Sequence, residues 1–285
     1  MKSIPANGGC LATDGSLLRN FGRKPAIPMK PTRPLFSIIV PTYNEERLLP
    51  ALLDSIHHQT FQDFEVIVAD DQSNDRTQQI ALGYGARVIR SNGIGEYPSR
   101  NVAAEAAEGS ILVFTGADAR MPTNLLSSVA SKFKGDSRLA GIYCPTYPYD
   151  AALWAKIEFM SWYVLTTILY WVTREANAST AFFAIKTNIF RETKGFLNVM
   201  HADSSLSRQV SKSFKIRPRI DMVIFVSGRR TEMGFVRFNR YHLAMIVDIV
   251  FAFLRKSNWL NEQKKYRILL HTKSRRSRGQ ETPGV

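Results

Sequence analysis

The chain of 285 residues contains only two cysteines, Cys10 and Cys144. Two thiols are too few for a disulfide framework, which excludes the class of small secreted domains that depend on several bridges. A reducing, cytoplasmic setting is therefore the simpler expectation. The beginning of the chain, MKSIPANGGCLATDG, also lacks an apolar core of about 7 to 15 residues, so it does not have the pattern of a secretory signal.

Long apolar runs are absent as well. No charge-free apolar stretch reaches about 20 residues, the length that a helix needs to cross a bilayer. Residues 241–254 are a shorter apolar segment near the C-terminus, and Asp248 interrupts them. Four basic residues border this segment: Arg237, Arg240, Arg255 and Lys256. The expected structure is an interfacial or re-entrant helix whose neighbouring cations reach lipid phosphates.

Acidic residues are outnumbered only at the two ends of the chain. Residues 1–35 carry six Lys and Arg against one acid, and residues 215–285 carry sixteen against five, whereas residues 36–214 carry sixteen against eighteen. The net charge of +14 therefore lies on the flanks, which attract anionic lipid or nucleic acid. We favour an anionic membrane surface and no nucleic acid. The neighbouring apolar residues form long faces, whereas nucleic-acid grooves carry isolated stacking aromatics along a charged track.

These changes in composition divide the chain into four parts. Residues 1–34 hold five of the thirteen prolines and show little periodicity, so they are interpreted as a disordered basic arm. Residues 35–228 form the expected folded domain. Residues 229–260 are interpreted as a basic and apolar membrane-associating segment, and residues 261–285 as a basic tail.

The most informative stretch of the sequence lies between residues 36 and 77. Two short apolar runs, residues 36–40 and 64–69, have the length of buried strands, and each ends in polar, turn-rich sequence. Between them, apolar residues recur at helical spacing: Leu48, Leu49, Leu52, Leu53 and Ile56. The order strand, helix, strand predicts two parallel strands joined by a right-handed crossover, and hence an α/β fold.

In open parallel sheets, ligands bind beyond the carboxyl ends of the strands. The sequence places five candidate residues there: Pro41, Tyr43, Asn44, Asp70 and Asp71. Adjacent carboxylates repel each other when both are ionised, so an outside partner such as a base edge, a ribose or a cation is expected. The alternative is that Asp70 and Asp71 cap the next helix together with Ser73 and Asn74.

PTYNEE after the first strand and ADDQSNDRT after the second resemble the paired signatures of family 2 glycosyltransferases, and the resemblance covers roughly residues 36–215. It implies a GT-A fold, with a mixed, mostly parallel sheet flanked by helices, and an inverting transfer from a UDP- or GDP-sugar. In that family, the positions of Tyr43 and Asp71 hold the base by stacking and by accepting from a base N–H. Asp70 suits the ribose, and Pro41 and Asn44 complete the nucleotide-binding set.

A further expected strand, residues 111–114, runs into TGADARMP, which resembles the family's metal loop, usually Asp-x-Asp. Here Gly116 replaces the first carboxylate, Ala117 borders the nucleotide and Asp118 remains as the metal ligand. Mg²⁺ commonly uses only one or two protein carboxylates, with phosphates and water as its other ligands. We therefore expect a divalent cation, Mg²⁺ or Mn²⁺, at Asp118. A weakened or metal-independent site is the alternative.

Three arginines are candidates for contacts with the phosphates of the donor. Arg100 lies in the first turn of a helix expected from about Pro98, where the helix dipole disfavours a cation. Its SRN context resembles the sequence that borders the nucleotide pocket in the family. A surface ion pair between Arg100 and Glu96 is the alternative. Arg229 and Arg230 occupy the place where relatives carry basic residues near the donor pyrophosphate, and they are weaker candidates.

Residues 180–215 resemble the acceptor half of the family's site, with an apolar strand, a Gly-Phe turn and a helix opened by Asp203. The resemblance implies that Asp203 is the general base that takes the proton of an acceptor hydroxyl. The preceding residue is Ala202, where the family usually has glutamate. Asp203 also suits the N-cap of that helix, and His201 is a less favoured alternative base.

Aromatic residues are concentrated in residues 150–173, which hold three of the four tryptophans. As a helix, this segment places Tyr163 and Tyr170 on one stripe and Val164 and Ile168 on another. We interpret it as an amphipathic helix in a membrane interface, with an ordinary core helix that covers the sheet as the alternative.

The sequence lacks the terminal Gln-x-x-Arg-Trp signature of processive polysaccharide synthases, which favours a single transfer. Aromatic helices and basic flanks favour a lipid-linked acceptor, either a polyprenyl phosphate or a lipid-linked glycan. They also favour a peripheral or monotopic position on the cytoplasmic face of a membrane. The alternative is a non-catalytic protein of the same fold that binds lipid or a partner through its basic flanks.

Overall fold

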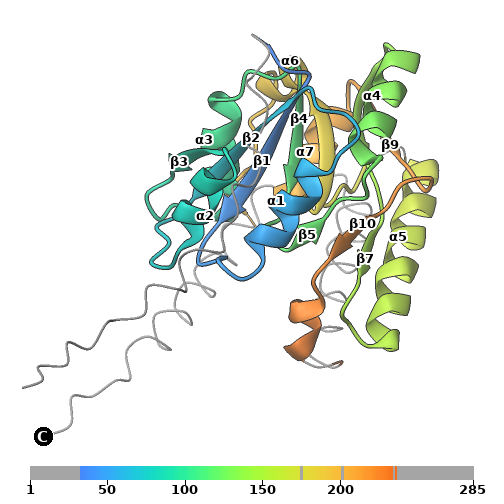
Figure 1. Cartoon of the computed structure of the whole chain (residues 1–285). Coiled ribbons are helices and arrows are strands. Elements are labelled where there is room, and N and C mark those ends of the chain that lie inside the picture. Colours follow the sequence, from blue (N-terminus) through green and yellow to red (C-terminus); the bar gives the residue numbers. More distant parts are fainter. Residues whose placement is uncertain (1–32, 174–175, 200–201, 234, 236–285) are drawn as a thin grey trace, which may run out of the picture.

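The computed structural model describes residues 33–173, 176–199, 202–233 and 235, and its centre is a seven-stranded sheet (Figure 1). Across the sheet the order is β3 (Arg87–Arg90), β2 (Phe64–Asp70), β1 (Phe36–Thr42), β4 (Ile111–Thr115), β8 (Phe182–Lys186), β6 (Leu139–Tyr143) and β9 (Lys215–Pro218). All neighbouring pairs are parallel except the two made by β8, which runs antiparallel to β4 and β6. The expected mixed, mostly parallel sheet is confirmed.

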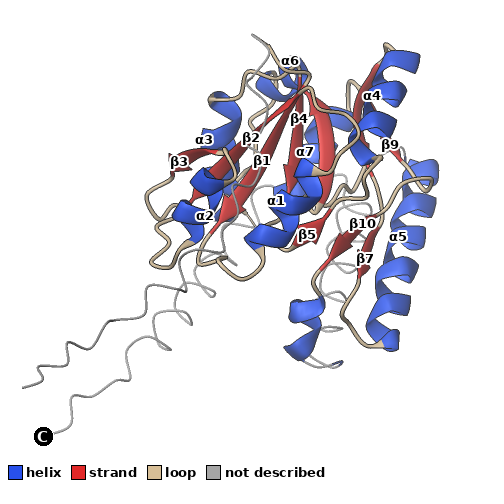
Figure 2. Cartoon of the chain, in the orientation of Figure 1, coloured by secondary structure: helices blue, strands red, loops and turns tan. Residues whose placement is uncertain are grey.

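Helices surround this sheet (Figure 2). They are α1 (Leu49–His57), α2 (Thr77–Gly83), α3 (Glu96–Glu105), α4 (Leu125–Gly135), α5 (Leu153–Thr173), α6 (Thr187–Arg191) and α7 (Ala202–Ser211). Side chains of α1, α2 and α4 join one buried apolar cluster, and side chains of α3, α5, α6 and α7 join a second one. The sheet is therefore covered on both faces.

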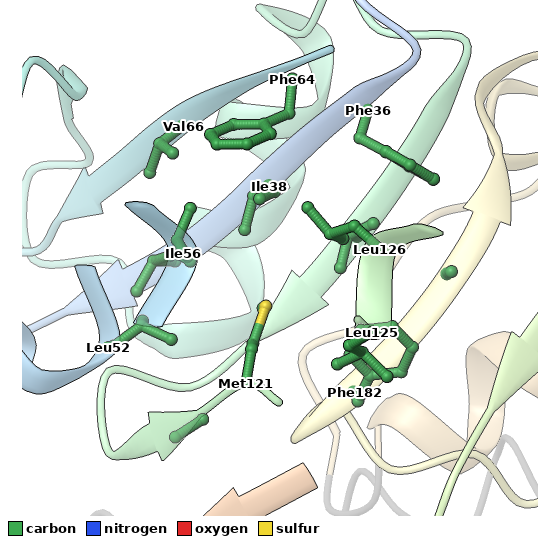
Figure 3. Close-up of a cluster of buried hydrophobic side chains, with 14 of the residues drawn as sticks. Phe36, Ile38, Leu52, Ile56, Phe64, Val66, Met121, Leu125, Leu126 and Phe182 are labelled. Atoms are coloured by element: carbon green, nitrogen blue, oxygen red, sulfur yellow. The ribbon is translucent and has the colours of Figure 1, made fainter. Parts of the chain in front are cut away.

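Strand β1 shows how the two clusters use alternate residues. Ile38 and Ile39 are both fully buried, because neighbouring side chains of a strand point to opposite faces and both faces are covered. Ile38 packs in one cluster with Ile56 and Leu126 (Figure 3). Ile39 packs in the other cluster with Phe114. The continuous apolar runs of β1, β2 and β4 follow from this two-sided burial.

A second, smaller sheet brings the end of the described chain back to the first. Its order is β5 (Ala119–Arg120), β10 (Ile224–Val226) and β7 (Thr146–Pro148). Val226 lies opposite Ala119, so the chain that leaves β10 passes beside Asp118. The Ser227 amide donates to the Asp118 carbonyl oxygen over 2.9 Å. A short 3-10 helix, η2 (Gly228–Met233), follows and begins at this edge.

Helix α5 turns its tyrosine stripe toward the sheet and its aliphatic stripe away from it, an orientation that the sequence does not indicate. Tyr163 and Tyr170 are buried in the cluster that also holds residues of the sheet. The aliphatic side chains of α5 that are more than half exposed are Leu153, Ile157, Val164, Ile168 and Val172. The alternative of a core helix is thus right about the position of α5, but the apolar stripe, which normally faces the core, faces outward. Within the described residues, no helix is both long enough and apolar enough to cross a membrane.

The helix after β2 begins only at Thr77, although Ser73 and Asn74 are candidates for its cap. The preceding residues bind the loop after β1 instead. The Asn74 amide donates to Asn44 Oδ1 over 2.8 Å, and Asp75 Oδ2 accepts from the Glu46 amide over 3.1 Å. These side-chain contacts compete with the helix and delay its start.

Several expectations concern residues beyond the described part of the chain. The proposed interfacial helix at 241–254 and the basic tail at 261–285 lie outside it, as does the arm at 1–34 apart from residues 33 and 34. Of the proposed membrane-associating segment, 229–260, only residues 229–233 and 235 are described. The C-terminal part of the predicted fold therefore stays a prediction.

Gly195 provides a test of the turn that leads to α7. Its φ is +63°, a conformation that favours glycine, and a Cβ there would lie 2.6 Å from Asn101 Oδ1. We expect Gly195→Ala to lower the free energy of unfolding by about 1–3 kcal/mol, measured by urea denaturation. Gly135→Ala is the matched control, because a Cβ at Gly135 meets nothing within 4 Å. An equal loss in both variants would contradict this reading.

Candidate active site

The register of β1 and β2 brings Thr42 and Asp70 side by side at the carboxyl edge of the sheet. Asp70 is fully buried, and its carboxylate accepts hydrogen bonds from Thr42 Oγ1 (3.1 Å), the Ser73 amide (3.1 Å) and Gln78 Nε2 (2.7 Å). These contacts fold the loop after β2 against the edge. In this structure Asp70 shapes the loop that carries Asp71, and its contact with a ribose stays a prediction.

Asp71 anchors the loop that leads into α3. Its Oδ1 accepts from Ser91 Oγ (2.9 Å) and the Ile94 amide (3.0 Å), and its Oδ2 accepts from the Gly95 amide (2.9 Å). Because Gly95 is fixed in this way, α3 begins at Glu96, earlier than the sequence indicates. The capping alternative is wrong for both carboxylates, since α2 has no side-chain capping hydrogen bond at its start.

The loop after β1 displays Tyr43 at the same edge. Pro41 pairs with Ala69 inside the sheet. Asn44 adopts a left-handed φ of 53°, and its Oδ1 accepts from the Asn74 amide over 2.8 Å, so the two loops are tied together. The Tyr43 side chain is 52% exposed. An exposed ring on a fixed loop can stack on a flat ligand.

Arg100 lies next to the end of β4, with only 1% of its side chain exposed. Nη1 donates to the Thr115 carbonyl oxygen and Nη2 to Glu96 Oε1, each over 2.9 Å. The surface-pair alternative therefore names the right partner, but the guanidinium is buried. Its Nε has no hydrogen-bond partner among the described residues. Arg100 ties α3 to the strand that carries residues 116–118, and its contact with a phosphate stays a prediction.

Glu45, Asp118 and Arg229 meet at this edge although they are far apart in the sequence. Arg229 Nη1 and Nη2 donate to the two carboxylate oxygens of Glu45 over 2.9 and 2.7 Å, and Nε lies 3.5 Å from Asp118 Oδ2. The hydrogen bonds to Glu45, followed by the charge of Asp118, raise the pKa of Arg229 above its ordinary value. The side chains of Glu45 and Asp118 are 13% and 15% exposed. The side chain of Arg230 lies outside the described part of the structure.

The turn that carries Asp118 contains one carboxylate. A Cβ on Gly116 would lie 2.7 Å from Asp118 Oδ1, so the aspartate leans over the bare backbone of the glycine. Ala117, between them, is buried. Nowhere in the described ranges do three His, Cys, Asp or Glu side chains gather as a complete metal site. The turn fits a Mg²⁺ or Mn²⁺ ion that takes one protein carboxylate and completes its shell with ligand phosphates and water.

Asp203 lies on a different element, in the first turn of α7. Because α7 begins at Ala202, Asp203 lies inside the helix rather than at the expected capping position. Its Oδ1 accepts a hydrogen bond from the Ser204 amide over 2.8 Å. The segment before α7 is tied to α3, because Asn101 Nδ2 donates to the Phe196 carbonyl oxygen over 2.8 Å. The alternative base His201 lies outside the described residues.

Two carboxylates at this edge are not singled out by the sequence. Glu45 follows Asn44 in the PTYNEE motif, and its position just after a strand is a signal that could have identified it. Asp150 accepts hydrogen bonds from Ser227 Oγ (2.9 Å) and the Gly228 amide, and thereby fixes the start of η2. No local pattern marks Asp150, because its partners follow 77 and 78 residues later.

Residues 37–193 match the family model described as glycosyl transferase family 2. A PGL/p-HBAD biosynthesis glycosyltransferase from Mycobacterium bovis is 43% identical over 91 residues, which cover 30% of this chain and 36% of that protein. TarS from Staphylococcus aureus, a poly(ribitol-phosphate) beta-N-acetylglucosaminyltransferase, is 38% identical over 104 residues, which cover 34% of this chain and 18% of that protein. The chain thus spans well under half the length of these relatives.

Two solved structures share the fold. The mannosyltransferase PcManGT from Pyrobaculum calidifontis, in complex with GDP-Man and Mn²⁺, has a TM-score of 0.55 at 24% identity, over 72% of this chain and 61% of that chain. Residues 1–349 of S. aureus TarS, in complex with UDP-GlcNAc, have a TM-score of 0.53 at 21% identity, over 68% of this chain and 58% of that chain. At these identities the likeness establishes the fold alone.

Proposed function

The chain belongs to glycosyltransferase family 2, and on that basis we propose that it transfers one sugar, with inversion, from a nucleoside diphosphate sugar to an acceptor. The GT-A type of fold expected from the sequence is confirmed. The proposed donor is a UDP- or GDP-sugar. Its support is the expected nucleotide set at the sheet edge, together with the UDP-GlcNAc and GDP-Man bound by the two structural neighbours.

The observation that carries this proposal is the arrangement at the carboxyl ends of β1, β2 and β4. These strands are neighbours in the sheet, in the order β2, β1, β4. Tyr43 follows β1, Asp71 follows β2 and Asp118 lies three residues beyond β4. A nucleotide lying across this edge would find an aromatic ring and a carboxylate for its base, and a second carboxylate for the cation at its diphosphate.

Asp118 is the residue that would hold a divalent cation. When bound, the cation would offset the negative charge that develops on the departing diphosphate, where electrostatic stabilisation has its largest effect. Arg100 fixes the strand end that precedes Asp118. Tyr43 and Asp71 would orient the nucleotide, so that the bond to be broken lies beyond its diphosphate on the acceptor side.

Asp203 is the proposed general base. In an inverting transfer, the acceptor oxygen attacks the anomeric carbon from the face opposite the diphosphate. The bond from that carbon to the diphosphate oxygen breaks, and Asp203 takes the acceptor's proton. If the acceptor is a lipid phosphate that is already ionised, no base is required and Asp203 orients it.

The outer stripe of α5 supports a lipid-linked acceptor, either a polyprenyl phosphate or a lipid-linked glycan. A contiguous exposed apolar face marks contact with a partner protein or a membrane. We propose an anionic membrane, because the Arg217 guanidinium lies 5.6 Å from the Trp171 ring, a pairing suited to the depth of lipid head groups. The proposed location is peripheral or monotopic, on the cytoplasmic face, consistent with Cys144 being a buried free thiol.

Thermal unfolding with sugar nucleotides tests the proposed activity. UDP-GlcNAc, UDP-glucose and GDP-mannose would each be added with and without Mn²⁺. A ligand at about a hundred times its Kd stabilises a fold by roughly 2.7 kcal/mol, which is a readable rise in Tm. A rise that requires both one nucleotide and Mn²⁺ would support the proposal. No rise with any of them, on a folded sample, would favour the non-catalytic alternative.

Vesicle binding tests the membrane face. We expect the double variant Ile157→Ser, Val164→Ser to bind phosphatidylglycerol vesicles about tenfold more weakly, because it loses exposed apolar area on α5. Binding is measured by co-sedimentation at about 0.5 M NaCl, because this salt concentration screens the binding that depends on charge alone. Leu82→Ser is the matched control, since Leu82 is 62% exposed on α2, at the opposite flank of the molecule (Figure 1). Unchanged binding in the double variant would contradict a membrane role for α5.

A further inference from the structure

Arg229 occupies the position beside Asp118 where the proposed function requires a divalent cation. Its Nε lies 3.5 Å from Asp118 Oδ2, and its terminal nitrogens hold both oxygens of Glu45 over 2.9 and 2.7 Å. A bidentate guanidinium is among the strongest counter-ions that a protein offers to a carboxylate. Arg229 therefore already compensates part of the negative charge that would attract a cation to this turn.

Hydrogen bonds and close packing hold the backbone just before Arg229 in place. Asp150 accepts hydrogen bonds from Ser227 Oγ and the Gly228 amide, one residue before the arginine. Gly228 packs so closely that a Cβ on it would lie 2.6 Å from Ala151 Cβ. The fold thus sets the backbone position from which the Arg229 side chain, itself 41% exposed, reaches Asp118.

Among the described residues, Arg229 is the cation that pairs with Glu45 and Asp118. Glu96 also acts on Arg229, but it is already paired with Arg100 over 2.9 Å. If Arg229 withdraws from Asp118, this mostly buried carboxylate loses its counter-ion, which is an unfavourable state. Withdrawal of the guanidinium therefore favours the binding of another cation at Asp118.

We propose that Arg229 is a resident counter-ion that competes with the divalent cation for Asp118. Arg229 must leave Asp118 before a cation can bind there, while Glu45 keeps its hold on the displaced guanidinium. The inference rests on the proposed function, because it takes Asp118 as the ligand of the cation. Its direct consequence is that removing the arginine strengthens metal binding in the donor-free protein.

Mn²⁺ binding to the donor-free chain of 285 residues tests the competition. The free Mn²⁺ would be followed by electron paramagnetic resonance. We expect Arg229→Gln to bind Mn²⁺ about tenfold more tightly than the wild type, and Arg229→Lys to lie between them, because lysine keeps the charge but lacks the fork that fits Glu45. Adding Asp118→Asn to Arg229→Gln should abolish the gain. Arg76→Gln is the matched control: it removes the same charge from the neighbouring pair with Glu46 (3.2 Å) and should change affinity less than about twofold.

Three results would overturn the inference. They are equal or weaker Mn²⁺ binding by Arg229→Gln, a gain that survives Asp118→Asn, and no Mn²⁺ binding by any variant at millimolar concentration. Thermal unfolding of the wild type with sugar nucleotides separates this failure from that of the proposed function. If the nucleotide raises Tm but Arg229→Gln binds Mn²⁺ no more tightly than the wild type, only the competition is rejected. If the nucleotide does not raise Tm and the variant shows no gain in Mn²⁺ affinity, the donor site itself is rejected.

Discussion

Asp118→Asn is expected to lower kcat/KM for sugar transfer by about 10³-fold, equivalent to about 4 kcal/mol of transition-state stabilisation. Asparagine keeps the shape of the side chain and removes the charge. The turn cannot compensate, because Gly116 has no carboxylate and Asp118 is the single acidic side chain of the turn. The Mn²⁺-dependent rise in Tm with the sugar nucleotide should disappear as well.

Asp136→Asn is the matched control for this charge removal. Asp136 pairs with Lys215, at the end of α4 and the start of β9, and is not part of the donor edge. Its variant should keep full transfer activity. If Asp118→Asn retained metal-dependent transfer at the wild-type rate, Asp118 would not be the ligand of the cation, and the site would have to be sought elsewhere.

Asp203→Asn is expected to reduce kcat on a hydroxyl acceptor by about 10²- to 10⁴-fold and to leave the Kd of the donor unchanged. The reason is that Asp203 lies on α7, whereas the proposed donor residues follow β1, β2 and β4. Single-turnover kinetics together with calorimetric donor titration would separate the two effects.

Two comparisons decide whether Asp203 acts as a base. With an ionised phosphate acceptor, no proton has to be removed, so the loss in Asp203→Asn should become small. Ser204→Ala keeps the backbone amide that donates to Asp203 Oδ1, and it should retain activity on both acceptors. Wild-type rates of Asp203→Asn on a hydroxyl acceptor would exclude this residue as the base.

The elements that build the proposed donor-binding edge are those that local sequence predicts best. The strands β1, β2 and β4 are continuous apolar runs because both faces of the sheet are covered, and α1 shows a regular apolar stripe. The residues that follow these strands inherit their position from them. Tyr43 and Asp71 are therefore placed correctly at the edge by position in the sequence alone. Asp118, which follows an expected strand, is singled out by the resemblance of its loop to the family's metal loop.

The strands that escape prediction are short. β5, β7 and β9 contain two, three and four residues, too few for a periodic pattern to appear. They exist because a distant segment pairs with them, as Val226 does with Ala119. The second sheet, which returns the chain to Asp118, could not be derived from local sequence.

Contacts across long separations in the chain also limit what the sequence reveals about the site. The pair of Glu45 and Arg229 joins residues 184 positions apart. Buried Arg100 donates to the Thr115 carbonyl oxygen, which it can reach only when α3 lies against the end of β4. For α5, both stripes are apolar or aromatic, so periodicity identifies the helix without deciding which stripe faces the core.

The position of β8 determines when the two parts of the sheet can join during synthesis. β8 lies between β4 and β6, although it follows both in the chain. The pairing of β1 with β2 and β4 needs only earlier residues, so this half can assemble first. Until residues 182–186 have been made, β4 remains an open edge with the apolar sequence ILVFT. An unfinished or truncated chain would therefore expose a strand suited to pairing with other copies, and the interval before β8 emerges is the period of greatest aggregation risk.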